Sequence, residues 1–261
     1  MRFQEGITVK MKTRLSEKQI RKIVRKILVE RTSFTGFGGF KSTAVGDESK
    51  GSDFSYDGEV IDIGSLGPVD SSAVQRAQEL GKELGIDPAW VYAEERKESA
   101  HNPSAMAWNI HIMLNPKYTP GHVVTKEQKK ELEKLGFPID SSASYYGKDA
   151  ERAFSAAYKV NPGAAIAGGA WGLYQVLGSF TLNDYGSPAQ WLKKFKSDPV
   201  GVSKDSFKKW IKSQDSSFKE KVKAGDYAYT TRLYYGAPNA DYEKGIKQGV
   251  ALYKQKVTDS Q

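Results

Sequence analysis

The sequence contains no cysteine and only three histidines among its 261 residues. The absence of cysteine excludes disulfides, thiolate metal sites and cysteine nucleophiles together. No run approaches the roughly 20 consecutive apolar residues that a membrane-spanning helix needs, and the first residues lack the apolar core of a signal peptide. We therefore expect a soluble protein, which another component must deliver if it acts outside a cytoplasm.

Basic side chains outnumber acidic ones, 39 to 31, which gives a net charge of +8. A positive surface favours a polyanionic partner, such as nucleic acid, an anionic membrane face or an anionic cell wall, and charge does not choose among them. Hydrophobic residues make up 39% of the chain. This composition allows a sizeable core and excludes a wholly disordered protein.

Residues 1–32 are predicted to form a basic amphipathic helix, because Ser16 and Gln19 make a capping box at the start of residues 16–31. Its apolar stripe consists of Ile20, Ile23, Val24, Ile27 and Leu28. Such a helix docks on a membrane or virion surface, or packs on its own protein, and the pattern leaves both open. Residues 33–69 are rich in Gly, Ser and Asp and are predicted to be a flexible linker.

Two motifs in this linker are excluded as ligand sites. A segment from Asp53 imitates a calcium-binding loop, but Gly64 stands at the twelfth position, where a bidentate Glu is needed. The glycines at residues 36–39 lack the Lys-Ser/Thr ending of a phosphate-binding loop.

The remainder, residues 70–258, has helical periodicity and predicts a mainly α catalytic domain. The first apolar face carries Val74, Ala77, Gly81 and Leu84. Asp87 with Pro88, and the capping box of Thr125 and Gln128, mark two helix starts. Further helices are predicted near 148–159, 188–196, 204–213, 216–232 and 240–257, with a short hairpin near 103–125.

Glu98 is the first candidate for chemistry. It lies seven positions after Val91, so both project from one helix face. A carboxyl group on an inward face is costly unless it is paired, protonated or lining a cleft, and burial raises its pKa toward the range that a general acid needs. An ordinary ion pair with Lys97 explains the same spacing, and Glu94 and Glu95 compete for the role one turn earlier.

Two aromatic segments are candidates for binding. Residues 168–178 combine glycines with Trp171, Tyr174 and Gln175, which suits a glycan cleft, since sugars stack on rings and hydrogen-bond to amides. Close helix packing around small residues explains the same composition. Residues 226–238 form a tyrosine-rich helix end, for which a packed aromatic terminus is the alternative.

Metal chemistry is disfavoured. Glu98 and His101 stand three apart and could face a metal, but no second such pair accompanies them. We expect no metal and no cofactor.

The segments, in this order, resemble the phage-type N-acetylmuramidase family of the lysozyme-like superfamily. Glu98–Ser99 matches its Glu-Ser pair, and residues 108–111 (WNIH) are similar to its Phe-Glu-Arg-His-type segment. Residues 169–178 (GAWGLYQVLG) resemble its Ala-Ser-Trp-Gly-Leu-Phe-Gln-Ile-Met-Gly motif, and residues 232–238 (RLYYGAP) its terminal Arg-x-Tyr-Asn-Gly-Pro segment. The likeness covers residues 72–256.

The resemblance implies a lysozyme-like helical domain that cleaves the bond between N-acetylmuramic acid and N-acetylglucosamine in peptidoglycan. Glu98 would protonate the glycosidic oxygen, and Tyr234 would line the cleft near the reacting sugar. The residues that would hold the substrate are Ser99, Asn109, His111, Trp171, Tyr174, Gln175 and Tyr235.

One departure from the family concerns the second acid, whose place is taken by Asn109. Glycoside hydrolysis ordinarily uses two carboxylates, and an amide cannot be a carboxylate base. Three outcomes stay open. Asp149 or Asp184 substitutes, the acetamido group of the substrate assists in a lytic-transglycosylase-like reaction, or the domain binds without cutting.

The expected context is a bacteriophage endolysin or virion-associated lysin. Such a protein resides in the virion or the host cytoplasm before delivery and acts in the periplasm and cell wall. The rival interpretation is a non-enzymatic virion or wall-binding protein that keeps the fold, and nucleic-acid binding through residues 16–31 is less favoured.

Overall fold

The computed structural model describes residues 56–64, 67–140 and 143–259. The amphipathic helix at 16–31 lies outside the described residues, as does most of the linker at 33–69, including the start of the calcium-loop-like segment. The division into 1–32, 33–69 and 70–258 therefore stays a prediction. One part of the linker is described: Ile63 is 2% exposed in the protein core, and the backbone N–H of Ile61 donates to Ser155 Oγ at 2.8 Å.

The described residues are mainly helical, as the sequence predicts. The α-helices are α2 (Ala73–Leu84), α3 (Pro88–Ser99), α4 (Ile110–Leu114), α5 (Lys126–Lys134), α6 (Gly147–Val160), α7 (Pro162–Ala167), α8 (Pro188–Ser197), α9 (Pro199–Lys212), α10 (Ser217–Lys223), α11 (Tyr227–Tyr235) and α12 (Ala240–Thr258). Short 3₁₀ turns are η1 (Asp70–Ser72), η2 (Gly172–Tyr174), η3 (Gly178–Phe180) and η4 (Leu182–Tyr185). Within the described residues, no helix combines the length and the apolar composition that crossing a membrane requires.

A four-stranded antiparallel sheet joins distant segments in the order β2-β1-β3-β4. The strands are β1 (Met106–Asn109), β2 (Ser144–Tyr146), β3 (Gly169–Trp171) and β4 (Val176–Leu177). The hairpin predicted near 103–125 is wrong, because Ala107 pairs with Tyr146 on one side and Ala170 on the other. The chain cannot turn back after β1, since the Asn109 side chain accepts a hydrogen bond from Ile112 N and starts α4 there.

Local capping signals placed several helices correctly. Asp87 accepts from Ala89 N at the start of α3, and both hydrogen bonds of the capping box between Thr125 and Gln128 are present. The single helix predicted at 216–232 is wrong, because it divides into α10 and α11. Gly225 has φ +68° between them, and Asp226 caps the new helix.

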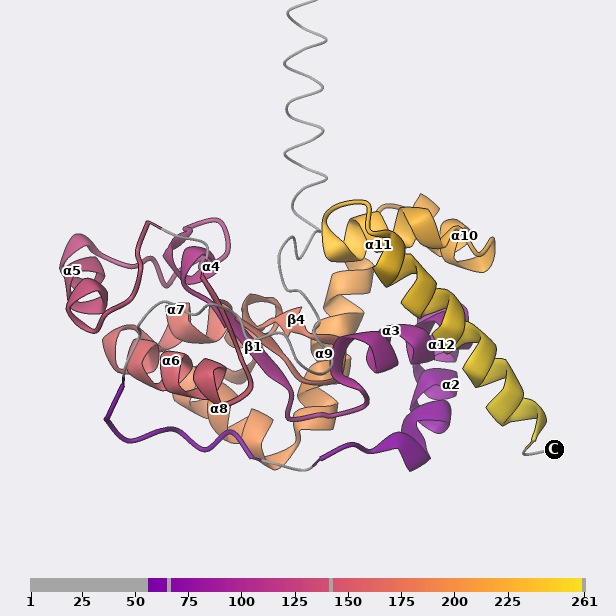
Figure 1. Ribbon diagram of the computed structural model, residues 1–261, viewed down its shortest axis with the longest axis horizontal. Coiled ribbons are helices and arrows are strands. Elements are labelled where there is room, and N and C mark those ends of the chain that lie inside the picture. Colours follow the sequence, from indigo (N-terminus) through magenta and orange to yellow (C-terminus); the bar gives the residue numbers. More distant parts are fainter. Residues whose placement is uncertain (1–55, 65–66, 141–142, 260–261) are drawn as a thin grey trace, which may run out of the picture.

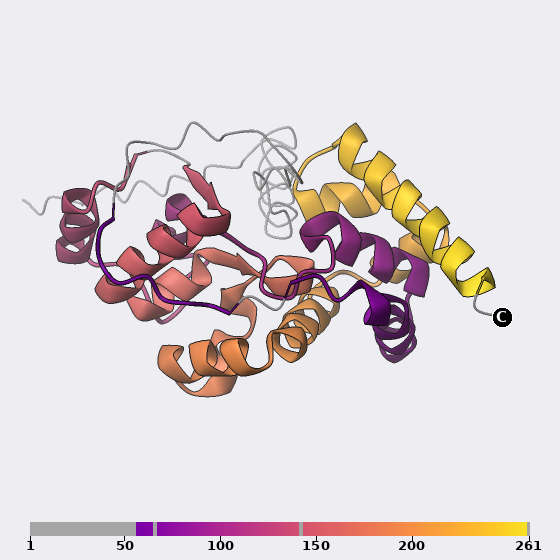
Figure 2. The ribbon, with the colours of Figure 1, turned by 60° about the horizontal axis from the view of Figure 1, so that its bottom comes forward.

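The described residues form two lobes, visible from two directions in Figures 1 and 2. The first lobe contains α4–α8 with β1, β2 and β3, and the second contains α2, α3 and α10–α12; β4 and α9 lie between them (Figure 1). Each lobe has its own aromatic core, with Trp108, Trp171 and Trp191 in the first and Trp90 and Trp210 in the second.

Helix α12 packs closely along α3. Gly249 makes the approach possible, because a Cβ added there would lie 2.7 Å from Ala93 Cβ. At that distance something must shift. The glycine therefore sets how near Tyr242, at the start of α12, comes to the carboxyl-bearing end of α3.

We predict that Gly249→Val destabilises the protein by about 1–3 kcal/mol, because the added methyl groups force α12 away from α3. Ala251→Val is the matched control, since Ala251 is exposed on the same helix and Val there costs only about 0.7 kcal/mol of helix propensity. Urea unfolding measures both. Equal losses would show that the helices do not meet at Gly249.

Candidate active site

Glu98 lies in the last turn of α3. The helix ends there because Ala100 and His101 adopt φ of +51° and +64°, a conformation that residues other than glycine rarely adopt. The chain then continues into β1 of the first lobe (Figure 1). Glu98 therefore lies at the end of α3 from which the chain crosses to the first lobe.

Glu98 is a half-buried residue, and its Oε1 accepts a hydrogen bond from the Tyr242 hydroxyl of α12. Burial raises the pKa of Glu98 to about 7, although the Tyr242 hydrogen bond and the charge of Lys97 oppose the shift. Lys97 Nζ itself lies 5.5 Å from the centroid of the Tyr242 ring. A carboxyl group that is half protonated near neutral pH can both donate and accept a proton there.

Glu94, one turn earlier, is completely buried, and its Oε2 contacts the same Tyr242 hydroxyl. Its other oxygen, Oε1, has no hydrogen-bond partner among the described residues. Burial raises the pKa of Glu94 well above its ordinary range, and the negative charge of Glu98 adds to the shift. Burial therefore favours the neutral, protonated form of Glu94.

Glu95 is also completely buried, but its surroundings are polar. It forms an ion pair with Arg76, lies 2.9 Å from His101 Nδ1, and accepts from the Tyr174 hydroxyl at 3.0 Å. Burial raises the pKa of Glu95, but the hydrogen bonds with His101 and Arg76 outweigh it and lower the pKa overall. Glu95 is therefore a structural anion that ties α3 to α2 and η2.

The three segments that the sequence singled out meet around this helix. Tyr174 from η2 contacts Glu95, and the hydroxyl of Tyr234 from α11 donates to the carbonyl oxygen of Tyr174. The rings of Tyr234 and Tyr242 stack with centroids 6.5 Å apart. Helix α3, residues 168–178 and residues 226–238 are thus neighbours in space.

The predicted roles of the aromatic residues need correction. Trp171 is 2% exposed in the first lobe, where its Nε1 donates to Ile166 O and its ring packs on Phe154 at 5.0 Å. It cannot stack on a sugar. Tyr174 and Tyr234 are 0% and 1% exposed, so they support the site from beneath and do not line a cleft.

Two polar residues also have local structural duties. Gln175, at φ +47°, donates through Nε2 to the carbonyl oxygens of Ala105 and Gly172 and so holds the turn between β3 and β4. Ser99 Oγ donates to Glu95 O within α3. By contrast, Tyr235 is partly exposed, with its ring 5.5 Å from that of Tyr242, and it stays a candidate for substrate contact.

Asn109 and His111 belong to the first lobe. Asn109 is 8% exposed; besides capping α4, it donates from Nδ2 to Ser144 Oγ at 2.8 Å. His111 is exposed on α4. The duties of Asn109 are those of a helix cap and a link to β2, which accounts for the amide without a catalytic role.

The two acids predicted as substitutes point to other partners. Asp149 pairs with Arg152 at 3.8 Å on the surface of α6, and Asp184 pairs with Lys209. The carboxyl group that the structure places beside Glu98 is Glu94 instead.

Tyr242 was missed by the sequence analysis, although a signal for it existed. Tyr242, Ile246, Gly249 and Val250 recur at the spacing of one buried helix face. A tyrosine on such a face needs a polar partner for its hydroxyl, and the carboxyl groups of α3 supply it.

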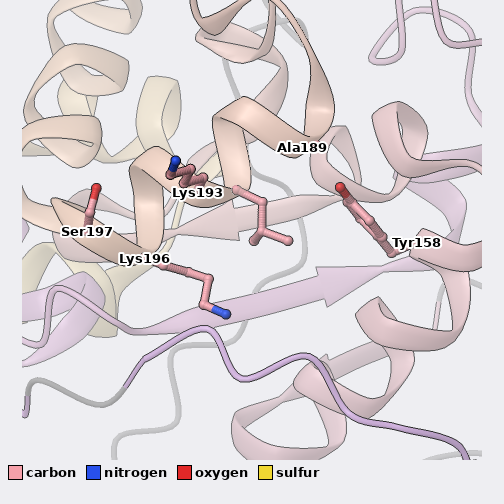
Figure 3. Close-up of a pocket in the computed structure, with 6 residues that line it drawn as sticks. Tyr158, Ala189, Lys193, Lys196 and Ser197 are labelled. Carbon is pink, nitrogen blue, oxygen red and sulfur yellow. The ribbon is translucent and has the colours of Figure 1, made fainter.

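A separate pocket of about 540 Å³ opens on the first lobe (Figure 3). It is lined by Tyr158, Ala189, Leu192, Lys193, Lys196 and Ser197. These residues come from α6 and α8 and include no carboxylate, so the pocket is separate from the site around Glu98.

No protein-family model matches this chain, and no curated protein sequence matches it. Among solved structures, it is similar to the crystal structure of a Burkholderia AP3 phage endolysin, with 18% sequence identity, coverage of 71% of this chain and 70% of that chain, and a TM-score of 0.49. At that identity and TM-score, the likeness says nothing about the activity of this chain.

We predict that Arg76→Met destabilises the protein by about 3 kcal/mol or more, because it leaves the buried Glu95 carboxylate without its cation. The matched control is Lys204→Met, which breaks the surface pair with Glu79 and costs at most about 1 kcal/mol. Urea unfolding at neutral pH measures both. If the unpaired charge causes the loss, adding Glu95→Gln to Arg76→Met recovers part of it; no recovery would contradict this account.

Proposed function

We propose that this protein cleaves the glycan strands of peptidoglycan at the bond between N-acetylmuramic acid and N-acetylglucosamine, with Glu98 as the proton donor. The observation that carries the proposal is Glu98, a half-buried residue in the last turn of α3 whose carboxyl pKa is raised by burial to about 7. A carboxylic acid with such a pKa is what general acid catalysis requires. The resemblance of Glu98–Ser99 and residues 169–178 to muramidase motifs supports the substrate class.

The chemistry needs one proton and one bond cleavage. Glu98 gives its proton to the glycosidic oxygen as the bond from that oxygen to C1 breaks, and the departing sugar leaves as an alcohol. The resulting Glu98 carboxylate keeps the Tyr242 hydrogen bond, which is stronger to an anion than to a neutral acid. Water then bonds to C1 and returns a proton to Glu98, which restores the acid.

A lytic transglycosylase is the second candidate, and the burial of Glu94 favours it. The carboxyl group beside Glu98 is inaccessible to a substrate, and Asn109 is a helix cap. Glu98 must then act first as acid and later as base. In this reaction the 6-hydroxyl of the muramic acid bonds to its own C1 and gives its proton to Glu98, so that no water is consumed.

In this proposal the protein is a phage endolysin or virion-associated lysin, carried in the virion or made in the host cytoplasm and acting in the periplasm. The net charge of +8 favours retention on an anionic wall and weakens with salt. Docking on a virion or membrane surface through residues 16–31 is part of the proposal.

We predict that Glu98→Gln lowers the rate of glycan release from purified peptidoglycan by about 10²–10⁴-fold, because the amide keeps the shape but has no proton to transfer. Asp149→Asn and Asp184→Asn are the controls; as surface substitutions they change the rate by at most about twofold. Circular dichroism verifies folding. If the wild type releases nothing, the enzymatic function is rejected and a binding role remains.

The product distinguishes the two candidates. Mass spectrometry of the released fragments shows reducing N-acetylmuramic acid ends for a hydrolase and 1,6-anhydro ends for a lytic transglycosylase. Reducing N-acetylglucosamine ends would contradict the proposed bond.

We predict that the initial rate at limiting substrate falls about tenfold per pH unit above about pH 7. Glu98 must be protonated to act, and its pKa is about 7, so the active form predominates below that pH and is lost above it. Rates between pH 5 and 9 at constant ionic strength test this expectation. A rate that stays flat through that range would remove Glu98 as the essential acid.

A further inference from the structure

One hydroxyl group contacts two carboxyl groups in this site. Tyr242 Oη lies within hydrogen-bond distance of Glu94 Oε2 and Glu98 Oε1. A phenol has a single proton and can donate it to one acceptor only. In the other contact the carboxyl group must be the donor, so at least one of the two carboxyl groups carries a proton.

Burial identifies which carboxyl group that is. Glu94 is 0% exposed and its Oε1 has no partner among the described residues, so a charge there would be desolvated and unpaired. Glu98 has intermediate exposure as a residue, and the positive charge of Lys97 favours its anion. The permanent proton therefore belongs to Glu94.

We propose that Glu94 is a positioning residue that stays protonated and donates to Tyr242, which directs the Tyr242 hydroxyl proton at Glu98. This inference rests on the proposed function of Glu98 as the acid. If Glu94 were ionised, it would compete with Glu98 for the hydrogen bond that the Tyr242 hydroxyl donates. Because protonated Glu94 is itself a donor to Tyr242, the Tyr242 hydroxyl donates to Glu98.

Two consequences follow for the acid. Tyr242 occupies Oε1 of Glu98, so the transferable proton is carried by Oε2. When this proton leaves, the Glu98 carboxylate already accepts a hydrogen bond from the Tyr242 hydroxyl. Such a preorganised hydrogen bond to a developing charge lowers the activation free energy of bond cleavage.

Three further groups lie around the pair. Helix α3 contributes Lys97, α12 contributes Tyr242 and α11 contributes Tyr234. Burial raises the pKa of both tyrosines well above their ordinary range, and Lys97 supplies a positive charge to Glu94 and Glu98. Among the two carboxyl groups and the two tyrosines, Glu98 is the group that we expect to change charge between pH 5 and 9.

The test is a titration of the full chain without substrate, using glutamate labelled with ¹³C at the side-chain carboxyl group. We expect the Glu98 signal to titrate near pH 7 and the Glu94 signal to stay constant from pH 5 to 9.

Glu94→Gln keeps a neutral donor toward Tyr242, so the pKa of Glu98 moves by less than about half a unit. Tyr242→Phe removes the hydrogen bond to the anion and raises that pKa by about one unit.

Tyr235→Phe is the matched control, because it removes a neighbouring phenol hydroxyl and should leave the Glu98 titration in place. Two results would overturn the inference: a Glu94 signal that titrates between pH 5 and 9, or a fall of one unit or more in the pKa of Glu98 in Glu94→Gln, the sign of a lost negative neighbour. Should Tyr242→Phe not fold, the Glu94→Gln titration decides alone.

Unfolding measurements give an independent readout. Because the pKa of Glu94 is raised on folding, its stabilising contribution is complete below the pKa of the unfolded chain and declines as pH rises. The wild type should therefore lose stability relative to Glu94→Gln as pH increases from about 5 to 9. A constant difference would contradict the inference.

Failure of this inference differs from failure of the proposed function. Peptidoglycan cleavage that depends on Glu98, combined with an ionised Glu94, would reject the positioning role alone. Absence of cleavage, combined with a protonated Glu94, would reject the proposed function alone.

Discussion

The packing of α12 on α3 is the contact on which the candidate site depends. It brings one phenol hydroxyl, that of Tyr242, between two carboxyl groups on successive turns of α3. The close approach at Gly249 fixes the distance between the helices, and the desolvation that results changes the protonation of the carboxyl groups. The packing of α12 on α3 therefore controls the acid–base properties of Glu94 and Glu98.

Three glutamates of α3 show how local surroundings set protonation. Glu95 is buried among an arginine, a histidine and a tyrosine and remains an anion. Glu94 is buried with a single hydroxyl partner among the described residues, and burial raises its pKa well above the ordinary range. Glu98, at the partly exposed end of the helix, lies between these limits. The same side-chain type thus has three different environments within five residues, and in the proposed mechanism these give a structural anion, a neutral donor and the proton donor to substrate.

The aromatic motif residues contribute mainly beneath the site. Trp171 belongs to the core of the first lobe, and Tyr174 and Tyr234 link η2 and α11 to α3 through their hydroxyls. Glu98 and Tyr235 are less deeply buried than these rings. The buried rings make α3 rigid, and a fixed proton donor is worth more to catalysis than a mobile one.

The sequence by itself determined the mainly helical class, the capped starts of α3 and α5, and Glu98 as the candidate acid. These features depend on side chains within a few positions of one another, such as Asp87 with Ala89 N. The strand partners of β1, the break between α10 and α11, and the contact of Tyr242 with Glu94 and Glu98 were decided by the tertiary structure. These contacts join groups up to 148 positions apart, and no local sequence pattern predicts which buried surfaces pack together. The protonation of each glutamate depends on these tertiary contacts, because desolvation and hydrogen bonding arise only when the chain is folded.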